Sequence, residues 1–159
     1  MRWLVGGLAV ALVALLVAIG VELSSRESVD DELTAAQQEV AAAARAEALA
    51  FLTVDHTDMD PLIDAVLAGA TGDFAKEYAA QRETLTSEAI RTEATSTGEV
   101  VALGVGALDD TSATVLLASN STVSNTATGD EGQVRFYRLR LDLVREDGRW
   151  LTTDVEFVR

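Results

Sequence analysis

The spacing of apolar residues changes near Gly98, and this change sets the fold class. Between residues 28 and 95, apolar side chains recur at intervals of three and four residues, the spacing of one helix face. From Gly98 onward they alternate with polar residues, and β-branched residues and turn signals become frequent. Helices followed by antiparallel strands are typical of an α+β domain in which helices cover one face of a curved sheet.

The N-terminal region contains the apolar run WLVGGLAVALVALLVAIGV, residues 3–21, which is 19 residues long and carries no charge. A helix of that length spans about 28 Å, close to the ~30 Å hydrocarbon core of a bilayer. Arg2 precedes the run and acidic residues dominate positions 22–32, so the positive-inside rule places the N-terminus in the cytoplasm. We therefore expect residues 1–22 to be a transmembrane signal anchor of a single-pass cell-membrane protein with an extracytoplasmic C-terminal domain. The alternative is a signal peptide cleaved near Ala18-Ile19-Gly20.

Four small residues repeat along one face of this expected anchor. Gly7, Ala11, Ala14 and Ala18 follow one another at spacings of four, three and four residues. Small side chains let a second helix approach closely in lipid, where close packing drives helix association. These four residues are candidates for partner binding, and the alternative is that an alanine-rich span shows this spacing by chance.

The segment after the anchor is expected to rise from the membrane as a stalk. Ser28 and Asp31 have the spacing of a helix cap. The apolar stripe that follows consists of small residues at first and becomes bulky only at Phe51. Residues 23–53 are therefore predicted to form a stalk and the first helix of an outer domain, and residues 54–159 the α+β remainder of that domain.

Two further helices are predicted before the strands. Asp60 can cap a helix that has Pro61 in its first position and ends at Gly69. Thr71 can cap the next helix, which we expect to break near residues 84–87.

Four strands are expected, at about residues 99–108, 112–123, 133–145 and 149–158. Their alternation predicts inward-facing sets of apolar residues, namely Val101, Leu103 and Val105, then Ala113, Val115 and Leu117, then Leu139, Leu141 and Leu143. The predicted outer domain is therefore a set of helices packed on a curved four-stranded antiparallel sheet.

The register of the last hairpin, residues 138–158, is predicted from parity. Its apolar residues occupy odd positions in both strands, so a shared buried face requires a loop with an odd number of residues. The three-residue loop Glu146-Asp147-Gly148 meets this condition, with Gly in the left-handed position of a turn with a bulge. Arg145 then faces Arg149.

The same register places opposite charges across the outer face of the hairpin. Arg140 faces Asp154 and Arg138 faces Glu156, so we expect these arginines to form a solvated charge ladder. The alternative is a ligand or partner site, for which an exposed Trp150 beside the ladder is the candidate anchor.

The net charge and the absence of cysteine exclude several function classes. The formal charge is -14, whereas nucleic-acid binding depends on clustered Lys and Arg. Without cysteine, the chain forms no disulfide, thiolate metal site or cysteine nucleophile. His56 lies among Asp55, Asp58 and Asp60 without the spacing of a calcium or zinc site. We therefore expect no metal, no cofactor and no role for His56 in activity.

No residue pattern predicts catalysis. Tyr78 and Tyr137 share the faces of predicted core residues and are expected to be buried aromatics. Asp154 lies on the opposite face from Tyr137 in the predicted register. We therefore expect that the protein is not an enzyme.

Several short motifs follow one another in an order typical of one family. After the apolar anchor come an alanine-rich helix ending at Phe51-Leu52, the stretch ATGDF at 70–74 with Tyr78, the stretch ATVLLA at 113–118, and DGRWL at 147–151 leading to VEFV at 155–158. This order resembles the Mce-associated membrane proteins of actinobacteria, accessory proteins of the mammalian-cell-entry lipid transport systems. The resemblance covers almost the whole chain and implies a nuclear-transport-factor-2-like (NTF2-like) cone, a fold also used by assembly factors of type IV secretion.

The resemblance implies a non-catalytic, membrane-anchored accessory protein that assembles or stabilises an Mce-type lipid or steroid import complex in the cell envelope. One alternative is a lipid-binding carrier module of the same system, whose cone holds an apolar ligand. Another is a secretion-system assembly factor of similar fold. A carrier requires an apolar cavity, whereas a scaffold can fill its cone with side chains.

Overall fold

The α+β class is confirmed by the computed structural model, which describes residues 33–129 and 132–158. In chain order the elements are α2 (Ala35–Leu52), β1 (Val54–Asp55), α3 (Met59–Gly69), α4 (Gly72–Ala80), α5 (Arg82–Thr92), β2 (Thr95–Leu108), β3 (Ser112–Ser124), β4 (Gln133–Glu146) and β5 (Arg149–Phe157). The strands form one antiparallel sheet in the order β1-β2-β3-β4-β5. The sheet has five strands and not four, because the two residues of β1 pair with the start of β2.

The predicted membrane anchor, residues 1–22 with Gly7, Ala11, Ala14 and Ala18, lies outside the described residues. None of the helices within residues 33–129 and 132–158 combines the length and the apolar character that a bilayer crossing requires.

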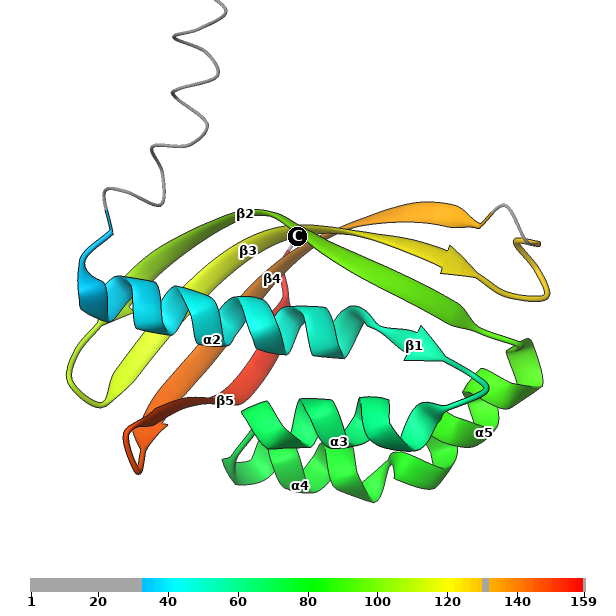
Figure 1. The fold of residues 1–159 in the computed structure, drawn as a ribbon, viewed down its shortest axis with the longest axis horizontal. Helices are drawn as coiled ribbons and strands as arrows, with labels where there is room; N and C mark the ends of the chain where they lie inside the picture. The colour runs from blue at the N-terminus through cyan, green and yellow to red at the C-terminus, as the bar shows by residue number, and fades with distance from the viewer. Residues whose placement is uncertain (1–32, 130–131, 159) are drawn as a thin grey trace, which may run out of the picture. The chain divides into compact units, whose positions relative to one another are not determined.

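From Glu39 onward, α2 belongs to the same compact unit as the curved sheet and packs against it. The strands arch over α2, and α3, α4 and α5 lie on the other side of it (Figure 1). The buried face of α2 repeats every four residues, through Val40, Ala44, Ala48 and Leu52. Burial begins at Val40 and continues to Leu52, so this part of the helix lies in the core.

The sheet supplies large aliphatic side chains to this core. The inward-facing residues of β3 and β4 are those predicted from alternation, Ala113, Val115, Leu117, Leu139, Leu141 and Leu143, and each is at most 4 % exposed. Burying one such leucine stabilises the fold by roughly 1.5 to 3 kcal/mol. In β2 the prediction for Val101 is wrong, because a bulge between Val100 and Ala102 turns Val101 outward, where it is 57 % exposed.

Helices α3 and α5 share a second, smaller core around Met59, Ile63 and Ala89. Helix α3 begins at Met59, before the predicted cap. Pro61 therefore lies within the first turn, which tolerates it because those N–H groups have no partner inside the helix. The break between α4 and α5 falls at Gln81, three residues before the predicted position.

The turn between β4 and β5 differs from the predicted one. Glu146 pairs with Arg149, so the turn has two central residues. Both have positive φ, 50° at Asp147 and 80° at Gly148, as a type I′ turn requires. The prediction of a three-residue loop, with Arg145 facing Arg149, is therefore wrong.

A β-bulge in β5 explains why parity failed to predict this turn. Asp142 pairs with Asp154 and Leu143 with Thr152, which leaves Thr153 unpaired in the ladder. The extra residue reverses the alternation of faces along β5. Before Thr153 the even-numbered residues face the core, and after Thr153 the odd-numbered residues do. The two turn residues and the one bulged residue together supply the odd number of residues that we assigned to the loop alone.

The bulge also moves Trp150 to the inner face. Its side chain is 9 % exposed and packs with the core of α2 and the sheet, so the expectation of an exposed Trp150 is wrong. Beyond the bulge, Val155 packs against this core, and Phe157 contacts Phe51 of α2 although it is 53 % exposed.

The predicted ion pairs on the outer face are replaced by others. Arg140 faces Glu156, with its Nη1 3.6 Å from Oε2, and its Nη2 is 2.9 Å from Oδ2 of Asp142. The predicted pairs of Arg140 with Asp154 and of Arg138 with Glu156 are wrong, because the bulge shifts the register between them.

We expect a double-mutant cycle on Arg140 and Glu156 to give a coupling free energy of about 0.2 to 1 kcal/mol, because both side chains are largely solvated. Urea unfolding of the wild type, the two alanine variants and the double variant measures it. The matched cycle on Arg138 and Glu156 should give no coupling. Coupling in the second cycle and none in the first would restore the predicted register.

Candidate functional site

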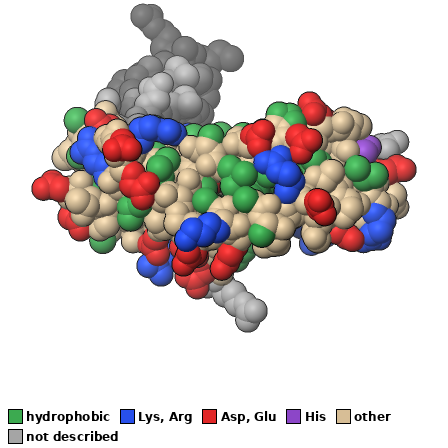
Figure 2. All heavy atoms as spheres, turned by 90° about the horizontal axis from the view of Figure 1, so that it is seen from below, with side chains coloured by type: hydrophobic (Ala, Val, Ile, Leu, Met, Phe, Trp, Pro, Cys, Tyr) green, Lys and Arg blue, Asp and Glu red, His purple; other side chains and the backbone are tan. Residues whose placement is uncertain are grey.

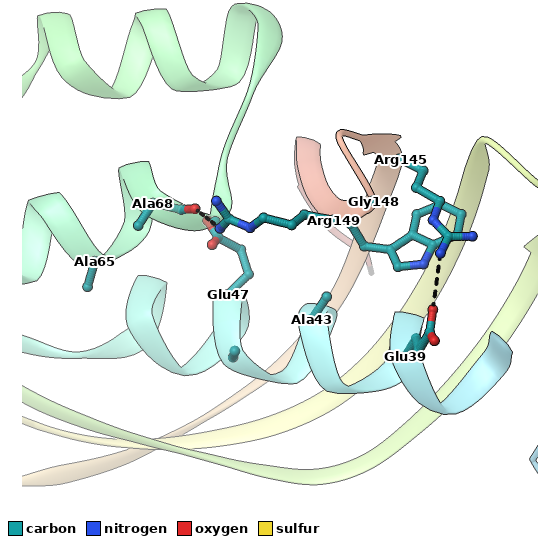
Figure 3. A pocket seen from close by; sticks show the side chains of 11 residues that line it. Glu39, Ala43, Glu47, Ala65, Ala68, Arg145, Gly148 and Arg149 are labelled. Carbon is teal, nitrogen blue, oxygen red and sulfur yellow. Dashed lines mark hydrogen bonds and ion pairs between the residues drawn. The ribbon is translucent and has the colours of Figure 1, made fainter. Parts of the chain in front are cut away.

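A polar cleft of about 530 Å³ lies between α2, α3 and the β4–β5 turn (Figure 3). Its floor consists of small residues from the two helices, Ala43, Ala46, Ala65, Ala68 and Gly69. Its polar groups come from two acids of α2 and from the hairpin, Glu39, Glu47, Arg145, Arg149 and Trp150. The cleft combines opposite charges, an aromatic ring and close access to helix backbone.

Backbone contacts hold the two sides of the cleft together. The linker after α3 joins β5 through a parallel bridge between Ala70 and Thr152, and the Thr71 N–H donates to the Thr152 carbonyl at 2.8 Å. Across the cleft, Nη2 of Arg149 donates to the Ala68 carbonyl at 2.9 Å. Carbonyls in the last turn of a helix lack intrahelical partners, so an arginine there satisfies one and complements the helix dipole.

Glu47 is a buried carboxyl at the base of the cleft. It is 3 % exposed, and its Oε1 has no hydrogen-bond partner among the described residues. Burial raises the pKa of Glu47 from 4.5 to about 8, because desolvation disfavours the charged form. Gly69 makes room for this carboxyl, since a Cβ at that position would lie 2.0 Å from Oε2.

Trp150 and Arg145 form the other end of the cleft. The guanidinium carbon of Arg145 lies 5.8 Å from the centroid of the Trp150 ring, within the range of a cation–π contact. Nη2 of Arg145 is 3.6 Å from Oε2 of Glu39. Within residues 33–129 and 132–158, the Trp150 Nε1 has no acceptor although it is buried. The role of Trp150 in partner binding stays a prediction, and the residue lines a cleft instead of lying on an exposed face.

Two other surfaces are candidates for contacts. A mainly apolar hollow of about 300 Å³ lies between α3, α5 and the end of α2, and includes Phe51, Ile63 and Tyr78. The pKa of Tyr78 is raised, first by burial and then by the charge of Glu47. On the outer face of the sheet, Val101, Leu116, Val134 and Phe136 are exposed, Phe136 by 78 %.

Charged side chains are spread over the face that Figure 2 shows, with acidic and basic groups interspersed and no single basic patch. His56 lies at a separate polar hollow with Glu93 and Asn125. No group of three His, Asp or Glu side chains in the described part of the chain has the geometry to hold a metal ion. The dispensability of His56 stays a prediction.

Comparison with known proteins gives the family. Residues 5–159 match the family described as "Uncharacterized protein Rv1363c/MT1408-like". The chain belongs to the Rv1363c/MT1408-like family. Rv1363c of Mycobacterium tuberculosis is 28 % identical over 130 residues, which cover 80 % of this chain and 49 % of that protein. The chain thus spans about half the length of this curated relative, which is itself described as uncharacterized.

Solved structures show the fold of this family member. CagV from Helicobacter pylori, a VirB8 homologue of a type IV secretion system, aligns with a TM-score of 0.59 at 4 % identity and covers 75 % of this chain and 95 % of that one. The periplasmic domain of DotI aligns with a TM-score of 0.57 at 12 % identity, covering 80 % and 98 %. An NTF2-like protein involved in plasmid conjugation aligns at 0.50 with 12 % identity, covering 74 % and 47 %. The expected NTF2-like fold is confirmed.

Sequence reasoning found one residue of the cleft, Trp150, and missed its charged groups. Arg149 was placed only opposite Arg145 across the predicted loop, and Glu47 was not singled out. The signal for Glu47 was its place four residues before Phe51, on the apolar stripe of an amphipathic helix. An acid on the buried face of a helix is rare unless paired, and therefore marks a site.

Proposed function

We propose that this Rv1363c/MT1408-like protein is a non-catalytic, membrane-anchored module that assembles with other proteins in the cell envelope, in the manner of a secretion-system component of similar fold. The observation that carries the proposal is the filled interior of the cone. Val40, Val115 and Leu141 meet between α2 and the sheet with no exposed surface. Such an interior suits a scaffold, whose outer surfaces do the binding.

The carrier alternative is less well supported. The apolar hollow beside Phe51 has about 300 Å³, and a second one on the sheet beside Leu103 and Leu117 has about 420 Å³. Both volumes are at the lower end of the range for drug-sized ligands, and both hollows are too small to enclose a lipid. The larger cleft is lined by two acids and two arginines, a poor environment for an acyl chain.

The likeness to the periplasmic domain of DotI covers 98 % of that domain, which supports an extracytoplasmic position for the domain described here. An Mce-type transport complex remains the second candidate assembly, on the strength of the ordered motifs from ATGDF to VEFV. The two candidates predict the same kind of protein and differ only in the complex that it joins.

Site-specific photo-crosslinking in native membranes tests this function. Photoreactive residues at Ala46 in the cleft, Phe136 on the outer sheet face and Ala127 in the β3–β4 loop sample three exposed surfaces. We expect reproducible adducts with envelope proteins from at least one surface, and the unreactive surfaces serve as controls. The identity of the captured proteins separates the two candidate complexes. Absence of protein adducts, together with stoichiometric lipid in mass spectra of the purified protein, would support the carrier.

A further inference from the structure

Two buried polar atoms in the cleft are left without partners. Oε1 of Glu47 and Nε1 of Trp150 belong to side chains that are 3 % and 9 % exposed, and neither finds a partner within residues 33–129 and 132–158. Both residues line the same cleft. A buried donor or acceptor without a partner costs roughly 1 to 3 kcal/mol, and a bound molecule with complementary groups would recover that energy.

The charges around these atoms favour an anion. Arg145 and Arg149 bring two positive charges to the cleft, against the negative charge of Glu39. Glu47 adds no charge at neutral pH, because burial raises its pKa to about 8. Among the described residues, the guanidinium of Arg149 donates one hydrogen bond, to the Ala68 carbonyl, and Arg145 makes one long ion pair, with Glu39. Other N–H donors of both arginines can therefore bind an acceptor.

The shape of the cleft favours an extended chain. Its floor of alanines and Gly69 lets a peptide backbone come close to α2 and α3. An open cleft with this floor suits two or three residues of an extended segment. A single carboxylate also balances the net charge better than a doubly charged phosphate, which would lie beside Glu39.

We propose that the cleft binds an acidic peptide segment of a partner protein, with the carboxylate of an Asp or Glu side chain held by Arg145, a peptide carbonyl accepting from Trp150 Nε1, and Arg149 donating to the peptide backbone at the other end of the cleft. This inference rests on the proposed function and names the chemistry of the partner. Glu47, protonated at neutral pH, donates to a second backbone carbonyl of the segment. The partner's carboxylate replaces Glu39 as the acceptor of Arg145.

Trp150 provides the readout. The chain has two tryptophans, so Trp3→Phe in the full-length protein leaves Trp150 as the single indole N–H in an NMR spectrum. The probes are a blocked pentapeptide with one glutamate between alanines, its glutamine counterpart and inorganic phosphate. We expect the glutamate peptide to shift the Trp150 indole resonance saturably and to bind at least about tenfold more tightly than the glutamine peptide.

Variants separate the cleft from nonspecific charge effects. Arg145→Gln and Arg149→Gln should each weaken binding of the glutamate peptide by about tenfold, whereas Arg138→Gln, an exposed arginine of the same strand outside the cleft, should leave it unchanged. If loss of the hydrogen bond to Ala68 prevents Arg149→Gln from folding, Arg145→Gln alone tests the proposal. In the wild type, binding should weaken as the pH rises through 8, and in Glu47→Gln it should not.

Three results overturn the inference: no saturable shift with the glutamate peptide, equal binding of the glutamine peptide, or tighter binding of inorganic phosphate, which would indicate a phosphate-bearing ligand such as a lipid headgroup. Failure here is distinguishable from failure of the proposed function. If Arg145→Gln still yields the crosslinked proteins of the wild type, the cleft is not the peptide site although the assembly function stands.

Discussion

Replacing Glu47 by Gln is expected to stabilise the protein above pH 8 by up to about 5 kcal/mol and to change its stability little at pH 4.5. The reason is the buried position of the carboxyl, which keeps its proton in the folded state to about pH 8 but loses it in the unfolded state near pH 4.5. Glutamine has nearly the same shape and is neutral throughout this range.

The sign follows from proton binding. Between pH 4.5 and about 8 the folded state holds a proton on Glu47 that the unfolded state has released, so unfolding releases a proton and becomes easier as the pH rises. The stability associated with Glu47 is fully present below pH 4.5 and falls by at most about 1.4 kcal/mol per pH unit up to pH 8. The free energy of unfolding of Glu47→Gln should not fall in this way between pH 4.5 and 8.

Urea unfolding of the wild type and Glu47→Gln at half-unit steps of pH measures the difference. Glu39→Gln, at the exposed rim of the same cleft, is the matched control and should show the wild-type dependence on pH. Parallel curves for the wild type and Glu47→Gln would mean that the carboxyl is hydrated and ionised in the folded protein.

Gly98→Ala should destabilise the protein by about 2 to 3 kcal/mol. Strand β2 crosses the end of α2 at this point, and a Cβ on Gly98 would lie 2.6 Å from the Cβ of Leu52. The Ser96 hydroxyl donates to the Leu52 carbonyl at 2.8 Å nearby, so helix and strand cannot separate without losing this contact. The atom in the way is the Cβ of Leu52, which is fixed to the backbone, so no change of side-chain rotamer moves it away.

Gly104→Ala is the matched control in the same strand. A Cβ at Gly104 meets no atom within 4 Å, and alanine restricts the unfolded chain more than glycine, so this variant should be stabilised by up to about 1 kcal/mol. Thermal and urea unfolding of both variants measures the two effects. Equal stability of the two alanine variants would show that α2 and β2 are not in direct contact at Gly98.

The contrast between Gly98 and Gly104 shows a limit of prediction from sequence patterns. Both lie in β2, whose predicted range began at about residue 99, next to Gly98, and nothing in the local sequence pattern separates them. Their difference arises because Leu52, 46 residues earlier than Gly98 in the chain, packs against one and not the other. Contacts between residues so distant in sequence depend on how the helix crosses the sheet, which periodicity does not encode.

The hairpin illustrates the same limit within a short segment. The Asp147-Gly148 dipeptide favours the two-residue turn that is observed, but the apolar parity argued for three residues. The bulge at Thr153 resolves this conflict. It is stabilised from outside the turn, through the Thr153 hydroxyl that donates to the Asp142 carbonyl at 3.0 Å and through the bridge from Thr152 to Ala70.

The sequence by itself determined the order of helices and strands, the inward residues of β3 and β4, and the exclusion of cysteine chemistry, because these depend on local periodicity and composition. Only the tertiary structure decided which polar residues meet. Glu47, Arg149 and Trp150 come from α2 and from a hairpin about 100 residues later. Their meeting depends on a bulge, on a glycine opposite the carboxyl and on the packing of α3 against β5, and each of these is a contact between segments that are far apart in the chain.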